Sequence, residues 1–79
     1  MKVHVVYFAQ VAEKIGLSKE EIELPDGSNS TDLLTVLYNK YPMLRDLTFK
    51  VAVDHELSNR QLALKPDCEV ALLPPFAGG

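Results

Sequence analysis

The sequence has little of several residue types on which common functions depend. Its 79 residues contain one cysteine, Cys68, and no tryptophan. A single cysteine excludes an intrachain disulfide and a cysteine metal cluster. No apolar run approaches the roughly 20 residues needed to span a bilayer, and the segment after Met1 has the pattern of a strand rather than of a signal peptide. We therefore expect a cytoplasmic protein with no membrane partner.

Basic residues are also scarce. The chain has 8 Lys and Arg against 11 Asp and Glu, which gives a formal net charge of -3 at pH 7. Proteins that bind nucleic acids or anionic membranes use Lys and Arg to neutralise phosphate charge. This balance argues against a nucleic-acid partner and favours a protein partner with a basic groove.

Residues with catalytic potential lack the spacing that catalysis or metal binding requires. His4 and His55 are far apart in the sequence and match no metal-ligand spacing, so we expect both at the surface. Cys68 lies between Asp67 and Glu69, whose negative charges disfavour a nucleophilic thiolate. There is no glycine-rich phosphate loop. We expect no catalytic residue and no metal site in the body of the chain, and hence no enzyme in the isolated chain.

Alternating apolar residues predict a sheet. Strands rich in β-branched and aromatic residues are expected at 3–8, 19–24, 49–53 and 69–73, with a weak, short one within 57–64. Turns are expected at 25–27, 54–55 and 65–67. In the second strand, Ile22 and Leu24 share one face, and we expect the acidic residues to form a solvated strand edge: Glu20, Glu21 and Glu23.

Two helices are expected between these strands. The first covers residues 9–15, with Gly16 at its left-handed C-cap. The main helix is expected to begin at an N-cap, Ser30, and to end before Pro42, with Asp32 in its first turn. Its apolar stripe follows the i, i+3, i+4, i+7 rule: Leu34, Leu37, Tyr38 and Tyr41. This order of elements predicts an α+β fold in which one main helix packs across a mixed sheet of about five strands.

The last six residues differ in character from this body. Pro74 and Pro75 favour an extended path, whereas Gly78 and Gly79 have no Cβ and allow another surface to approach closely. At roughly 3.3 Å per residue, six residues can place a terminal carboxylate about 20 Å beyond the body, far enough to enter another protein's active site. We therefore predict a domain at 1–73 and an extended tail at 74–79.

Three stretches of the chain, residues 5–9, 51–54 and 69–79, resemble the family of small, sulfur-carrying subunits of molybdopterin synthase. The specific part is the closing pattern of an apolar strand, two prolines, two variable residues and two glycines. Gly-Gly alone is shared with ubiquitin and with the sulfur carrier of thiamine biosynthesis, whereas the proline pair favours the molybdopterin branch. One departure is Asp67-Cys68, where the family usually has Gly-Asp.

This resemblance implies a ubiquitin-like β-grasp fold and a carrier mechanism. In the family, an ATP-dependent adenylating enzyme joins AMP to the terminal carboxyl, and a sulfur donor protein then converts it to a thiocarboxylate, here on Gly79. The large synthase subunit, in a hetero-oligomer expected to be a heterotetramer, receives the tail: Pro74, Pro75, Phe76, Ala77 and Gly78. There the sulfur passes to a pterin precursor to form the dithiolene that later holds molybdenum. No cofactor is expected to stay bound, because AMP and sulfur are attached to Gly79 transiently.

Strand alternation also predicts where the partner binds. The residues expected to face the main helix are Val3, Val5, Tyr7, Val70 and Leu72. Alternation then turns Val6, Phe8, Ala71 and Leu73 outward, and Phe76 follows them closely. Apolar surfaces of this kind often bind partners. We predict a partner surface formed by Val6, Phe8 and Leu73 near the root of the tail.

Other functions can use the same chain end. One alternative is a sulfur carrier for thiamine synthesis or tRNA thiolation, with another acceptor. A second is a ubiquitin-like modifier whose Gly79 becomes amide-linked to lysines of target proteins. A third is a plain interaction domain with an inert tail.

Overall fold

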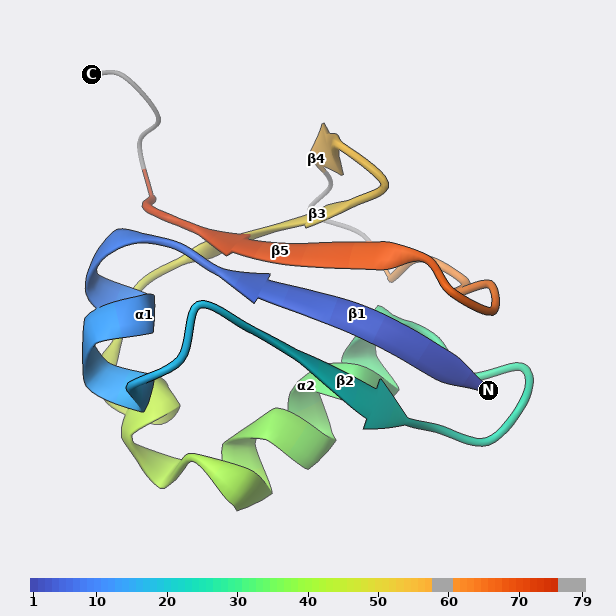
Figure 1. The fold of residues 1–79 in the computed structure, drawn as a ribbon, viewed down its shortest axis with the longest axis horizontal. Coiled ribbons are helices and arrows are strands. Elements are labelled where there is room, and N and C mark those ends of the chain that lie inside the picture. The colour runs from blue at the N-terminus through green and yellow to red at the C-terminus, as the bar shows by residue number, and fades with distance from the viewer. Residues whose placement is uncertain (58–60, 76–79) are drawn as a thin grey trace.

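A mixed five-stranded sheet forms one layer of the molecule, and the helices lie against one of its faces (Figure 1). The computed structural model describes residues 1–57 and 61–75. The strands are β1 (Lys2–Tyr7), β2 (Lys19–Glu23), β3 (Lys50–Val53), β4 (Glu56–Leu57) and β5 (Glu69–Leu73). The helices are α1 (Ala9–Ile15), α2 (Ser30–Lys40) and a 3-10 helix, η1 (Pro42–Asp46). The predicted α+β architecture is confirmed.

The strands lie in the order β2-β1-β5-β3-β4. The central pair, β1 and β5, is parallel, and the other three neighbouring pairs are antiparallel. The first and last strands of the chain therefore lie side by side, as Figure 1 shows. This pairing brings the end of β5, from which the tail leaves, next to the end of β1.

The core lies between the sheet and α2. The strand residues predicted to face the helix are almost completely buried: Val3, Val5, Tyr7, Val70 and Leu72. On α2, Leu37 is completely buried, and the other members of the predicted stripe pack against the core as partly buried residues: Leu34, Tyr38 and Tyr41. The prediction omitted Leu33, which is also completely buried. The apolar face of α2 is thus one residue wider than the stripe.

The predicted N-cap of α2 was wrong by one residue. The cap is Asn29, whose side-chain oxygen accepts the backbone N–H of Asp32 at 2.9 Å, while the Asp32 carboxylate accepts the N–H of Asn29 at 2.9 Å. This reciprocal pair is a capping box. Ser30 is buried, and its hydroxyl oxygen accepts the N–H of Leu62 at 2.9 Å. Both residue types cap helices well, so the sequence alone did not separate them.

The segment after α2 forms a 3-10 helix that the sequence did not predict. Pro42 ends α2 as expected, but it also opens η1, where a proline is tolerated because the first N–H groups of a helix need no internal partner. Leu44 in η1 is completely buried and adds to the core. None of the helices in the described ranges is long and apolar enough to cross a membrane.

Several turns depend on left-handed backbone conformations. Gly16 ends α1 with a φ of 87°, as predicted, and the turn of Asp54 and His55 has φ values of 48° and 71°. Asp67 has a φ of 64°, and it stands where the resembling family usually has glycine. Aspartate tolerates this conformation better than most residues. The Asp67 N–H also donates to the carbonyl of Lys2 at 2.7 Å, which holds the turn against β1.

Candidate functional site

The tail leaves the domain beside the point where β1 passes into α1 (Figure 1). Tyr7 is opposite Leu72 in the parallel ladder, and the N–H of Phe8 donates to the Leu72 carbonyl at 3.2 Å. Pro74 and Pro75 follow β5 and are partly buried. The rest of the predicted tail lies outside the described residues, and its role stays a prediction: Phe76, Ala77, Gly78 and Gly79.

The predicted partner surface lies on the outer face of the sheet, opposite the helices. Val6 is opposite Ala71 in the ladder of β1 and β5, and Ala71 is opposite Ala52 in the ladder of β5 and β3. Directly opposite residues point to the same face of a sheet, so these three form an apolar row across it. Phe8 is 43% exposed, and Val6 and Leu73 are partly buried. The outward orientation predicted for these residues agrees with this register.

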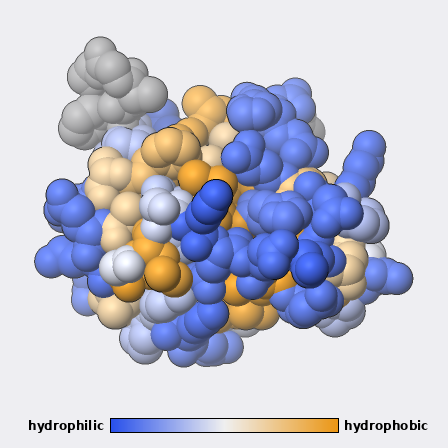
Figure 2. All heavy atoms as spheres, viewed as in Figure 1, coloured by the Kyte–Doolittle hydropathy of each residue, from blue (hydrophilic) through white to orange (hydrophobic). Residues whose placement is uncertain are grey.

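A hollow of about 280 Å³ lies on this face at the root of the tail. Phe8 and Leu73 line it together with Ala71, Leu57, His55 and Glu69. Val6 instead lines a neighbouring hollow of about 480 Å³ with charged residues of β1, β2 and β5. The space-filling view shows apolar side chains gathered on the left half of the molecule and hydrophilic ones over most of the right half (Figure 2).

Leu57 is a member of this surface that the sequence analysis missed. It lies opposite Ala52 in the β3–β4 pair and is exposed. The signal was present in the predicted turn at Asp54 and His55, because a two-residue turn fixes the register of the strands that it joins. That register places Leu57 on the same face as Ala52 and Ala71.

Both histidines lie at the surface, as predicted. The ring of His4 lies between carboxylates, 3.6 Å from Glu21 and 3.4 Å from Asp67. The side chain of His55 is 88% exposed, and its Nε2 lies 3.4 Å from the Glu69 carboxylate. In residues 1–57 and 61–75, no group of three or more His, Cys, Asp or Glu is arranged to hold a metal ion.

Burial, in addition to the charged neighbours, makes Cys68 a poor nucleophile. The side chain is buried, and burial raises the pKa of its thiol; the nearby carboxylates of Asp54 and Asp67 raise this pKa further. A thiol in these surroundings stays protonated at neutral pH, and a protonated thiol does not attack. The expectation drawn from the sequence agrees with this environment.

The prediction of a solvated edge was wrong for Glu20. Its carboxylate points toward α2 and accepts the hydroxyls of Tyr7 at 2.6 Å and Tyr41 at 2.7 Å, and the Lys40 ammonium at 2.7 Å. Burial alone would raise the pKa of Glu20, but these three hydrogen bonds outweigh burial and lower it. The cluster joins β1, β2 and α2, so we assign it a structural role. Glu21 and Glu23 are exposed, as expected.

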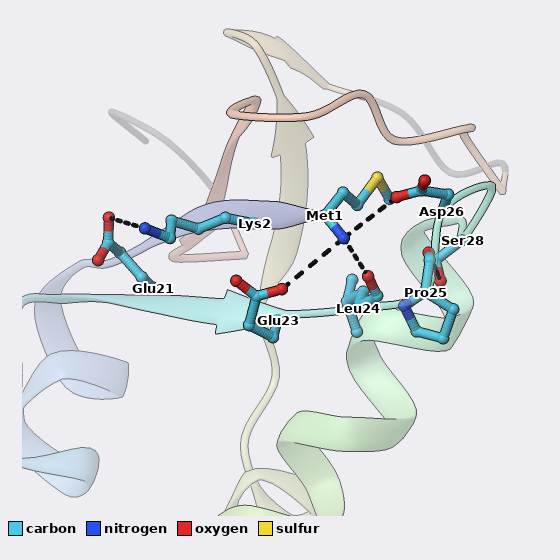
Figure 3. A network of polar contacts seen from close by, with 8 residues as sticks. All are labelled: Met1, Lys2, Glu21, Glu23, Leu24, Pro25, Asp26 and Ser28. Carbon is cyan, nitrogen blue, oxygen red and sulfur yellow. Dashed lines mark hydrogen bonds and ion pairs between the residues drawn. The ribbon is translucent and has the colours of Figure 1, made fainter.

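A second polar network surrounds Met1 (Figure 3). The amino group of Met1 donates to the Leu24 carbonyl at 2.6 Å and lies 3.2 Å from the Asp26 carboxylate and 3.7 Å from that of Glu23. This network ties the start of β1 to the end of β2. Figure 1 shows that it lies at the opposite end of β1 from the tail, so we assign it to the fold rather than to the site.

The parallel central strands, their antiparallel neighbours and the helix across the sheet define a ubiquitin-like β-grasp protein. The chain belongs to the ThiS family, whose model matches residues 5–79. A curated relative from Mycobacterium tuberculosis, named molybdopterin synthase sulfur carrier subunit, is 37% identical over 82 residues. That match covers 100% of this chain and 99% of the relative. The family predicted from the sequence is confirmed.

Solved structures agree with this assignment. A protein from Pyrococcus furiosus described as subunit 1 of a molybdopterin converting factor has a TM-score of 0.87 and 28% sequence identity; the match covers 96% of this chain and 99% of that one. A chain from the complex of subunits 1 and 2 of the molybdopterin-converting factor of Helicobacter pylori has a TM-score of 0.73 and 26% identity, with 100% of both chains covered. The similarity thus extends over the whole chain.

Proposed function

We propose that this chain is the sulfur carrier subunit of a molybdopterin synthase. The observation that carries the proposal is the family match, which runs through residue 79 and is supported by a relative of that name at almost complete coverage of both chains. In this proposal Gly79 provides the terminal carboxyl that carries sulfur. The domain at 1–73 presents this group, and Pro74 to Gly78 enter the partner.

The proposed chemistry follows from the nature of a terminal carboxylate. Its pKa is about 3.5, so at neutral pH it is an anion and a poor electrophile. An adenylating enzyme would activate it by joining AMP from ATP to the carboxyl and releasing pyrophosphate. A sulfur donor protein that carries a persulfide would then attack the activated carbonyl carbon, so that a C–S bond forms and AMP leaves. A thiol would act as the two-electron reductant that cleaves the S–S bond to the donor, which leaves a thiocarboxylate on Gly79. Inside the large subunit, this sulfur would pass to the pterin precursor and help to form the dithiolene.

The side chains of the body agree with a proposal in which other proteins catalyse the reactions at Gly79. The described residues offer a buried, protonated thiol and surface histidines, and among them no cluster of His, Cys, Asp and Glu could hold a metal ion. The proposal therefore places the catalytic residues in the adenylating enzyme and the large subunit. No cofactor would stay bound to this chain, which would act in the cytoplasm.

The partner is proposed from the Helicobacter pylori complex, in which the similar chain was solved together with a subunit 2. By analogy, this chain would bind a large subunit in a hetero-oligomer, and we propose a heterotetramer. The binding surface would be the outer face around Val6, Phe8 and Leu73, because it adjoins the root of the tail that must enter the partner.

Genetic complementation tests the function directly. The chain is expressed in a bacterial strain that lacks its own small subunit of molybdopterin synthase, and the activity of a molybdenum-cofactor enzyme is measured. We expect activity to return with the full chain and not with a chain that lacks Gly79. Rescue of a strain that lacks the thiamine sulfur carrier, without rescue of the first strain, would replace this proposal with the thiamine alternative.

Substitution of Phe8 tests the partner surface. Phe8→Glu removes the aromatic ring from the hollow and places a charge beside Leu73, so we expect the Kd for the large subunit to rise roughly 30-fold or more, as for the loss of an interface hot spot. Isothermal titration calorimetry with the purified large subunit measures this change. Val36→Glu, at a 37% exposed position of α2 below the sheet, is the matched control and should leave the Kd unchanged. Equal affinities for both variants would contradict the assigned surface.

A further inference from the structure

Glu69 is the charged residue that the two hollows of the outer face share. It lies at the start of β5, opposite His4 in the ladder with β1, and its side chain is 41% exposed. The backbone N–H of Glu69 donates to the Asp54 carboxylate at 2.9 Å, so a further negative charge lies close by. The carboxylate of Glu69 has the exposed ring of His55 as a neighbour at 3.4 Å.

A partner that covers the apolar residues of this face must also cover Glu69. Phe8, Leu73 and Glu69 line the same hollow, and that hollow lies at the root of the tail. Moving a carboxylate out of water is unfavourable unless a cation replaces the lost hydration. His55 supplies a cation only when it is protonated, and most of its ring is in contact with solvent.

We propose that the partner inserts an arginine side chain into this hollow and pairs its guanidinium with Glu69. This inference rests on the proposed function, because it names a recognition contact within the proposed interface. The chemistry of the hollow matches an arginine: Phe8 and Leu57 offer apolar contacts for its stem, and Glu69 offers a carboxylate for its head. Arginine suits such a site better than lysine because its planar group stacks on aromatic rings and pairs with carboxylates through two hydrogen bonds.

The charge of the chain favours the same occupant. The net charge is -3, and Asp54 lies beside Glu69, so the potential around the hollow attracts a cation. An apolar side chain of the partner would fill the hollow but would leave Glu69 covered and unpaired. Charge complementarity therefore selects a long basic side chain with an apolar stem.

Glu69→Gln tests the pairing while it preserves the shape of the side chain. The variant and the full natural chain are titrated into the purified large subunit by calorimetry. We expect the Kd of Glu69→Gln to rise roughly 30-fold or more, because the arginine would be buried without its counter-charge. Glu13→Gln, at an exposed position of α1 below the sheet, is the matched control and should bind like the natural chain. Thermal unfolding of both variants checks that they fold.

A third variant asks whether His55 supplies the cation. His55→Asn keeps a residue that tolerates the positive φ of this position, and we expect it to bind with unchanged affinity. An equal loss of affinity in His55→Asn and Glu69→Gln would overturn the arginine in favour of a protonated His55.

Three further results would also overturn the inference, and they separate it from the proposed function. Unchanged affinity in Glu69→Gln together with weak binding of Phe8→Glu would refute the arginine contact and leave the partner surface intact. Natural affinity in both variants would mean that the partner does not cover this face. Failure of the natural chain to bind the large subunit would refute the proposed function itself, and with it this contact.

Discussion

At the scale of single residues, Glu20 links three elements of the fold. Its carboxylate accepts hydrogen bonds from Tyr7 on β1, from Lys40 at the end of α2 and from Tyr41 just beyond α2, and its side chain is 12% exposed. Hydrogen bonds to a charged group contribute more than neutral ones. Glu20 therefore stabilises the packing of α2 against the edge strand, β2.

Glu20→Gln should destabilise the domain. The variant loses the charge that three donors share, so we expect the free energy of unfolding to fall by about 1–3 kcal/mol. Urea denaturation at pH 7 measures the change. Glu21→Gln, at the neighbouring exposed position on the outer face, is the control and should change stability by less than about 0.5 kcal/mol. Equal stability of the two variants would contradict the structural role of Glu20.

The same residue predicts a pH dependence. Because the pKa of Glu20 in the folded chain lies below its ordinary value of about 4.3, its contribution is complete above that value and is lost as the pH falls through the folded-state pKa. The stability difference between the natural chain and Glu20→Gln should thus be largest near neutral pH and shrink below about pH 4. A difference that grows on acidification would show that the pKa is raised instead.

Strand alternation contained enough information to place Glu20 on the helix-facing side of β2, but not to identify its hydrogen-bond partners. Glu20, Ile22 and Leu24 are two residues apart, so strand alternation puts all three on one face, and Ile22 and Leu24 are buried there. We expected exposure because the residue is charged. Its partner Tyr41 comes from beyond α2, and contacts between distant segments are not visible in local patterns. The packing of Lys40 and Tyr41 against β2 is what covers the Glu20 carboxylate in the folded chain.

At the scale of elements, strand periodicity predicted the two faces of the sheet well. Val70 and Leu72 are buried, and Ala71 and Leu73 lie on the other face, as alternation requires. The helices were predicted less completely. Leu33 lies four residues before Leu37 and belongs to the same apolar face, but the prediction omitted it, and Leu44 is buried in η1, which no stripe or cap indicates. The face to which a strand residue points follows from the two-residue period of side chains along a strand. The formation of η1 depends instead on the path of the chain between α2 and β3, which no local pattern gives.

The start of α2 gives a prediction at this scale. Asn29→Ala removes the side-chain acceptor of the capping box, and we expect the free energy of unfolding to fall by about 1 kcal/mol. Asn29→Asp keeps a capping oxygen and should retain most of the stability. Urea denaturation followed by far-ultraviolet circular dichroism measures both variants. If Asn29→Ala matches the natural chain, the cap is not at Asn29.

At the scale of the whole molecule, the residues that form the core and the outer face precede Pro74, whereas Gly79, the residue proposed to carry sulfur, follows them in the sequence. Residues 1–73 contain the core, the structural clusters of Glu20 and Met1, and the outer face with its hollows. The closing sequence pattern predicted the family of small, sulfur-carrying molybdopterin synthase subunits, and with it the β-grasp fold and the proposed carrier function. The proposed arginine contact at Glu69 was not accessible from the sequence, because it depends on two hollows formed by strands that are distant in sequence.

The proposed function depends on a sulfur atom carried on the carboxyl group of Gly79. Intact mass spectrometry of the chain, isolated from cells during active synthesis of the molybdenum cofactor, can detect this sulfur atom. We predict a species heavier by the replacement of one oxygen with sulfur, located by fragmentation at Gly79 and absent from a chain that lacks this residue. Detection of the unmodified carboxylate alone, under conditions in which the sulfur donor and the adenylating enzyme are active, would contradict it.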